Sequence, residues 1–209
     1  MRLIVFGAAG SVGHRTAAEA LARGHEVTAV VRRPTDLLPQ GVTVAIGDAA
    51  DPIQVARLST GHDAAVSAVR APAGREHEQV EATDALLKGT AEAGVRLLVV
   101  GGAATLTVPD SGKPVLEDPR YIADEWRAVA EASAAQHYRC IAEPTADWTY
   151  LSPPAILAPG ERTGRYRKGT DDLLVTDGAS RISVEDLAVA VLDELERPAH
   201  RRTRFTVAH

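Results

Sequence analysis

The stretch that decides the fold is Leu3-Ile4-Val5-Phe6-Gly7-Ala8-Ala9-Gly10-Ser11-Val12-Gly13, near the amino end of the chain. Four apolar residues ending at a glycine are typical of a buried strand, and an Ala-rich helix is predicted over residues 11–23. The glycines between them have the spacing G-x-x-G-x-x-G. Glycine lets the backbone turn sharply and lets a pyrophosphate approach the free N–H groups at a helix amino end. Residues 7–13 are therefore predicted to bind the diphosphate of a dinucleotide.

The alternation of strand and helix continues through the first half of the chain. Strands are predicted at 26–31, 42–46, 64–69 and 95–100, and helices at 52–58 and 76–93. Apolar strands that alternate with helices indicate a parallel sheet covered on both faces, and right-handed crossovers make it doubly wound. The predicted fold class is an α/β Rossmann sheet.

The second half of the chain is less regular. A Pro-rich and Gly-containing loop is predicted at 107–120, a helix at 121–142, a strand at 147–151, and a hairpin or small lobe at 160–178. Ser183 is the predicted N-cap of a helix that runs to Glu196, and a last strand is expected at 204–207. No domain linker interrupts the 209 residues, so we expect one domain over 1–209.

Composition excludes several classes of protein. A net charge of -5 makes nucleic acid an unfavourable partner, because a polyanion would be repelled. One cysteine, Cys140, excludes an internal disulfide and a Cys-rich zinc site, and the histidine spacing predicts no metal site. No apolar run approaches the ~20 residues of a membrane helix, and no signal peptide is evident. These patterns predict a cytoplasmic protein with a small-molecule substrate and no membrane partner, either a monomer or a homodimer.

Residues after the second, third and fourth strands indicate which dinucleotide binds. An acidic residue after the second strand would favour NAD, but Arg32 and Arg33 stand there, and a guanidinium pairs with the 2′-phosphate of NADP. NADP(H) is therefore predicted in preference to NAD. Asp48, followed by Ala49, is placed to accept a hydrogen bond from the adenine amino group. The segment Ala68-Val69-Arg70 is expected along the adenine ribose and the pyrophosphate, since ligands bind at the carboxyl ends of strands.

Over nearly its whole length the chain resembles the atypical short-chain dehydrogenase/reductase family, specifically its small NAD(P)H-binding, NADH-flavin reductase-like and epimerase/dehydratase-like members. The matching segments are 7–13, 41–48, 66–69, 99–102, 147–154, 159–164 and 181–186. The resemblance implies a small C-terminal substrate lobe, to which 152–182 contribute most. It also implies that Arg32 binds the 2′-phosphate, and that Gly101, Gly102 and the Pro153-Pro154 loop flank the nicotinamide.

The chain departs from that superfamily in its catalytic residues. None of its four tyrosines has a lysine four residues later, and Ala103-Ala104 occupy the place of the usual serine. The missing pair suits hydride transfer to a flavin, a quinone or a similar conjugated acceptor, which needs positioning rather than an acid. Thr105, Tyr121 and His137 are the remaining candidate catalytic residues, whereas Trp126 and Trp148 are expected to be packing residues. Two alternatives stay open: a non-catalytic NADP-binding redox sensor, and a specialised pathway reductase or isomerase.

Overall fold

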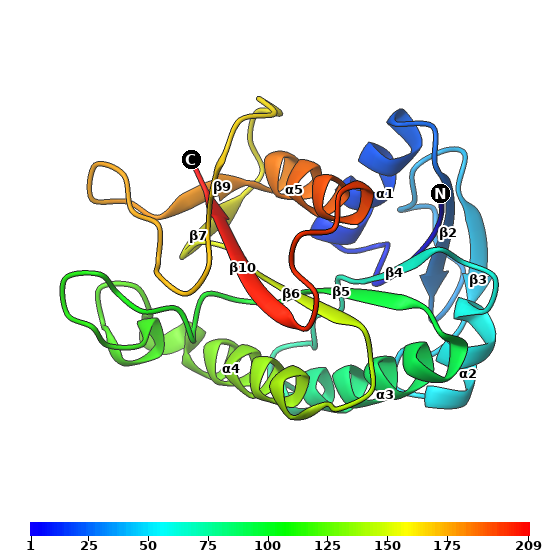
Figure 1. Cartoon of the computed structure of the whole chain (residues 1–209), viewed down its shortest axis with the longest axis horizontal. Coiled ribbons are helices and arrows are strands. Elements are labelled where there is room, and N and C mark those ends of the chain that lie inside the picture. Colours follow the sequence, from blue (N-terminus) through cyan, green and yellow to red (C-terminus); the bar gives the residue numbers. More distant parts are fainter.

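The computed structural model describes all 209 residues and contains an eight-stranded sheet with five α-helices (Figure 1). The strand order is β3-β2-β1-β4-β5-β6-β10-β8, and all neighbours are parallel except β10 and β8. The strands are β1 (Arg2–Phe6), β2 (Glu26–Val31), β3 (Thr43–Ile46), β4 (Ala64–Ser67), β5 (Arg96–Val100), β6 (Trp148–Ser152), β8 (Arg167–Gly169) and β10 (Thr203–Ala208). The predicted Rossmann sheet is confirmed.

Helices cover both faces of the sheet. α1 (Ser11–Ala22) and α5 (Val184–Glu196) lie on one face, and α2 (Pro52–Ser59), α3 (His77–Ala93) and α4 (Arg127–Ala142) lie on the other (Figure 1). Alternate residues of β1 enter opposite cores: Leu3 and Val5 pack toward α1 and α5, whereas Ile4 and Phe6 pack on the other side. Because both faces are buried, the strands are continuously apolar, which is the pattern seen in the sequence.

The predicted helix over 121–142 is wrong in its first six residues. α4 begins at Arg127, after an extended residue, Ala123, and a 3₁₀ turn over Asp124–Trp126. Tyr121 and Ile122 instead pack against a small apolar cluster beneath the loops that follow β5. Burial of these two side chains outweighs their helical sequence context. The N-cap expected at Ser183 is confirmed, because its hydroxyl oxygen accepts a hydrogen bond from the Asp186 N–H at 3.0 Å.

Two loop regions interlock beside the sheet. The Thr107 N–H donates to the Asp171 carbonyl, and the Leu173 N–H donates to the Thr107 carbonyl, both at 2.8 Å. Leu106 and Val108 from the first loop pack with Leu173 from the second, and with Val115 in a 3₁₀ turn over Val115–Glu117. The segment 160–178 contains β8, which extends the main sheet, while β7 (Ile156–Ala158) and β9 (Arg181–Ser183) form a separate parallel pair.

Candidate functional site: the carboxyl edge of the sheet

The residues predicted to bind a dinucleotide lie along one edge of the sheet. Parallel strands place all their carboxyl ends on the same side. The predicted residues follow β1 to β6 in turn: Gly7, Ala8, Ala9, Gly10, Ser11, Val12, Gly13, Arg32, Arg33, Asp48, Ala49, Ala68, Val69, Arg70, Gly101, Gly102, Pro153 and Pro154. The fold therefore brings together segments that are more than 140 residues apart in the chain.

The glycine turn after β1 is shaped by two close approaches of backbone. Gly7 has a φ of +81°, and a Cβ there would lie 2.6 Å from the Ala68 carbonyl oxygen. A Cβ on Gly13 would lie 2.2 Å from the Gly7 carbonyl oxygen. Any larger side chain would therefore push α1 away from the turn, and the glycines let the helix begin directly against β1.

The amino end of α1 has no internal partner for its polar groups. Gly10 is the N-cap, no side chain caps the helix, and no acidic residue lies in the first turn. The first N–H groups of a helix have no intrahelical acceptor, and they carry the positive end of the helix dipole. The turn with Gly7 and Gly13 is thus an open, positively polarised cradle, and its chemistry fits a pyrophosphate.

Arg32 and Arg33 are exposed at the carboxyl end of β2 and make no ion pair. Asp48 follows the neighbouring strand β3, so all three side chains belong to the same stretch of the edge. One Asp48 carboxylate oxygen accepts a hydrogen bond from the Ala50 N–H at 3.0 Å, which gives this residue a role in its own turn. The two unpaired guanidinium groups are available to an additional phosphate.

Arg70 and Trp126 meet across the carboxyl ends of β4 and β5. The Arg70 guanidinium carbon lies 5.4 Å from the centre of the Trp126 ring, within the range of a cation–π contact. Trp126 is 52% exposed, so the expectation that it is a packing residue is wrong. Trp148 is buried, as expected. An exposed aromatic ring over this edge provides a surface for another flat ring.

Tyr150 shapes the glycines after β5, a role that the sequence analysis missed. A Cβ on Gly101 would lie 1.9 Å from the Tyr150 hydroxyl oxygen, so only glycine fits there. That oxygen accepts a hydrogen bond from the Gly102 N–H at 3.2 Å, and the hydroxyl donates to the Ser133 carbonyl at 2.9 Å. Burial raises the pKa of Tyr150 above its ordinary value. The neutral tyrosine therefore supports the loop after β5. The two consecutive glycines after β5 are the feature of the sequence that could have indicated this close contact.

Two of the three candidate catalytic residues are in contact. Thr105 Oγ1 lies 3.0 Å from His137 Nδ1, and Arg204 Nη1 donates to the same threonine oxygen at 2.8 Å. Arg204 is also hydrogen-bonded to Asp171. Burial, together with the nearby Arg204 charge, lowers the pKa of His137 to about 4, so its ring is neutral at pH 7.

Tyr121 lies apart from this pair. Its ring packs against the small cluster beneath the interlocked loops, and the Arg120 guanidinium carbon lies 5.5 Å from the ring centre. Cys140 is buried as expected, and burial raises the pKa of its thiol to about 12, which leaves it protonated.

A cluster of ion pairs fastens the segment after β7 to α1. Glu19, in α1, accepts two hydrogen bonds from the Arg162 guanidinium at 2.7 Å and one from Arg23 at 2.8 Å. The hydrogen bond from Arg162 is the largest cause that lowers the pKa of Glu19. Asp186, in α5, accepts from the Gly164 N–H at 2.7 Å. Glu19 and Arg162 are more than 140 positions apart in the chain, so their contact could not be identified from local sequence.

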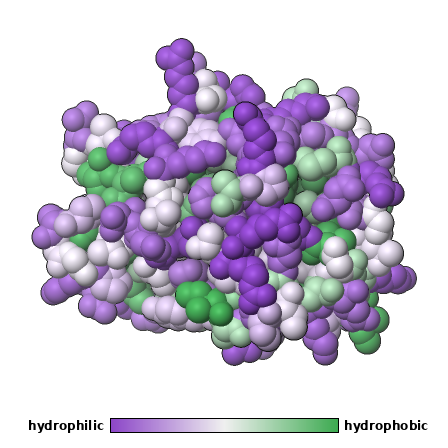
Figure 2. Space-filling model, viewed as in Figure 1, coloured by the Kyte–Doolittle hydropathy of each residue, from purple (hydrophilic) through white to green (hydrophobic).

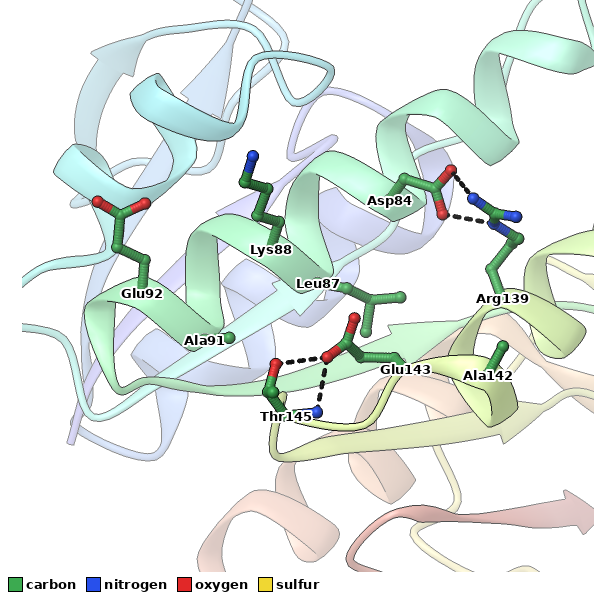
Figure 3. A pocket seen from close by; sticks show the side chains of 9 residues that line it. All are labelled: Asp84, Leu87, Lys88, Ala91, Glu92, Arg139, Ala142, Glu143 and Thr145. Atoms are coloured by element: carbon green, nitrogen blue, oxygen red, sulfur yellow. Dashed lines mark hydrogen bonds and ion pairs between the residues drawn. The ribbon is translucent and has the colours of Figure 1, made fainter.

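One sizeable cavity lies away from this edge. A hollow of about 750 Å³ opens between the carboxyl halves of α3 and α4, with Leu87 and Glu143 facing it (Figure 3). Because these helices run antiparallel to the strands, this hollow belongs to the amino edge of the sheet. Two pairs of its polar side chains bind each other: Arg139 is paired with Asp84, and Glu143 accepts from Thr145 (Figure 3).

Polar and charged side chains cover most of the face seen in Figure 2, and the apolar areas on it are small and separated. No helix is both long and apolar enough to span a membrane. No group of three or more His, Cys, Asp or Glu side chains is arranged to hold a metal ion.

Comparison with known proteins identifies the family to which the chain belongs. A family model described as NAD(P)H-binding matches residues 7–198. The uncharacterised protein YwnB of Bacillus subtilis is 40% identical over 99% of this chain and 98% of its own length. A structure named as a proposed epimerase of Bacteroides thetaiotaomicron is 36% identical, with a TM-score of 0.90 over 100% of this chain and 96% of that one. A structure named as a proposed NADH-flavin reductase of Streptococcus pneumoniae is 28% identical, with a TM-score of 0.87 over 100% and 99% of the two chains.

Proposed function

Because the chain belongs to the NAD(P)H-binding family, we propose that it is an NADPH-dependent reductase that transfers hydride to a flavin, a quinone or a similar conjugated acceptor. The observation that carries the proposal is the glycine cradle, where Gly7 and Gly13 leave the amino end of α1 open to a pyrophosphate. When bound there, NADPH supplies a hydride at its nicotinamide ring. The similarity to a structure named as a proposed NADH-flavin reductase supports a reductase.

The preference for NADPH rests on Arg32 and Arg33. A planar guanidinium can donate two hydrogen bonds to a phosphate dianion, whereas it gains much less from a ribose hydroxyl. Neither arginine has a carboxylate partner in the structure, so the charge is not already neutralised. Asp48 would accept a hydrogen bond from the adenine amino group with the oxygen that its own turn does not use.

The proposal of a conjugated acceptor rests on residues that follow β5 and β6 at the carboxyl edge of the sheet. Gly101 and Gly102 would flank the nicotinamide together with Pro153 and Pro154, and Trp126 offers an exposed ring nearby. A conjugated acceptor is already electrophilic, so the chain needs only to orient two flat rings and exclude water. His137 is neutral and Tyr150 is committed to the loop, so neither is a ready proton donor, and solvent would protonate the product.

The test is turnover with NADPH and FMN, and with NADPH and menadione, followed at the absorbance band of the reduced nicotinamide. We expect oxidation of NADPH with at least one acceptor and slower oxidation of NADH at equal concentration. Binding of NADPH without oxidation across a flavin and quinone panel would refute the reductase. It would favour the redox sensor, which shares the cradle but needs no acceptor.

A second candidate, the specialised pathway reductase or isomerase, is favoured by the hydrogen bond between Thr105 and His137. Such an enzyme would need a proton carrier, and this pair or Tyr121 would be the candidate. Tyr121→Phe, Thr105→Val and His137→Asn should each lower kcat strongly in that case. If none changes the rate with the best acceptor, the second candidate is excluded.

A further inference from the structure

A second cavity, of about 320 Å³, lies between the carboxyl half of α4 and the first residues of β6 and β10. Since the strands are parallel, the first residues of β6 and β10 mark the amino edge of the sheet, whereas His137 and Arg204 reach Thr105 in the loop after β5. The residues that matter to its chemistry are His137, Ile141, Trp148, Asp171, Arg202 and Arg204. We propose that this cavity binds a small organic carboxylate with a flat apolar body, at a site separate from the dinucleotide.

The first support is a buried donor without an acceptor. Trp148 is 4% exposed, and its indole Nε1–H has no hydrogen-bond partner in the protein. Buried indole N–H groups are normally paired, because a donor removed from water without an acceptor destabilises the fold. Trp148 lines the cavity, so a small movement of its surroundings would let a ligand carboxylate oxygen reach and satisfy this group.

The second support is the orientation of His137. Arg204 can only donate, so it uses one lone pair of the Thr105 hydroxyl oxygen and leaves the hydroxyl proton free for His137 Nδ1. A neutral ring that accepts at Nδ1 carries its proton at Nε2. No acceptor in the chain binds Nε2. In the tautomer whose Nδ1 accepts the Thr105 hydroxyl proton, His137 would be a second donor for an anion.

The third support is charge. The Arg202 guanidinium donates only to the backbone carbonyls of Pro144 and Glu143, and no carboxylate lies within ion-pair distance of it. Arg204 has one ion-pair partner, Asp171, whose side chain is 70% exposed. The cavity therefore carries an excess of positive charge. Trp148 and Ile141 supply apolar surface beside it, which suits an organic body better than a bare inorganic ion.

The test uses benzoate as the probe, with benzamide as its uncharged counterpart. NMR of the whole protein should show saturable shifts of the Trp148 indole N–H and of the His137 ring with benzoate, in the presence and in the absence of NADPH. Trp148→Phe keeps the ring and removes the donor, so it should weaken benzoate binding about tenfold, the loss typical of one hydrogen bond to a charged group. Trp126→Phe is the matched control and should leave the affinity unchanged.

Arg202→Gln provides an independent variant if Trp148→Phe fails to fold, and it should also weaken binding. Benzamide that binds as tightly as benzoate would overturn the assignment, because charge would then play no part. Shifts with inorganic phosphate but not with benzoate would overturn the organic carboxylate, and competition by NADPH would overturn the separate site. The inference does not depend on the proposed reaction, since NADPH binding and turnover are measured apart from it.

Discussion

Replacing Gly13 by alanine should disable the cradle while leaving most of the fold intact. The added Cβ would lie 2.2 Å from the Gly7 carbonyl oxygen and 2.9 Å from the Ala8 Cα, both of them backbone atoms that cannot rotate away. The turn would have to move by about 1 Å, which is enough to misplace groups that must meet a ligand. Each amide-to-phosphate hydrogen bond that is lost costs about 1.5–3 kcal/mol, a ten- to hundredfold rise in Kd.

Isothermal titration of NADPH into Gly13→Ala would measure that rise, and thermal unfolding would show that the variant is folded. Gly10→Ala is the matched control in the same turn, because its Cβ would lie 3.3 Å from the nearest atom, the Gly7 carbonyl oxygen, and needs only a small adjustment. We expect a much smaller effect there. A folded Gly13→Ala that binds NADPH within twofold of the parent would refute the cradle, because the diphosphate would then be held elsewhere.

Three further predictions concern charge. Arg32→Ala should raise the Kd of NADPH at least tenfold and leave that of NADH within twofold, with Arg33→Ala as the comparison; equal losses for both cofactors would contradict the 2′-phosphate assignment. Glu194→Gln should cost about 3–5 kcal/mol in urea unfolding, because it strands the buried Arg96 guanidinium, now 2.6 Å from the carboxylate. The His137 ring should stay neutral by NMR down to about pH 5, since its pKa in the fold is about 4. Because the pKa of His137 is lower in the folded chain than in the unfolded chain, the unfolded chain binds the proton first as the pH falls. The free energy of unfolding should therefore decrease as the pH falls from about 6.5 to about 4.

The fold could be predicted because its signals are local. Strands such as 26–31 end at turns, helices such as 52–59 begin at a proline, and both periods are visible within ten residues. The same holds for the glycine turn, whose shape depends on Gly7 and Gly13. The predicted cofactor residues fall on one edge because parallel topology alone brings the ends of β1 to β6 together.

The remainder of the site depends on contacts between distant residues. Nothing near Thr105 in the sequence indicates that it meets His137 and Arg204, 32 and 99 positions away. The start of α4 was misplaced because Tyr121 is drawn into a tertiary cluster, and Trp126 was misjudged because exposure depends on what covers it. The Tyr150 hydroxyl lies against Gly101 and Gly102, a relation that only the folded chain reveals.

The interlocked loops after β5 and β8 bear on how such a scaffold diversifies. Thr107 exchanges two backbone hydrogen bonds with the strip around Asp171, and the side chains on both strips share one apolar cluster. An insertion or deletion in either segment would break the register of both, so we expect related chains to change the two segments in concert. Chimaeras that exchange one segment alone should misfold locally, whereas exchanging both segments together should preserve the local fold.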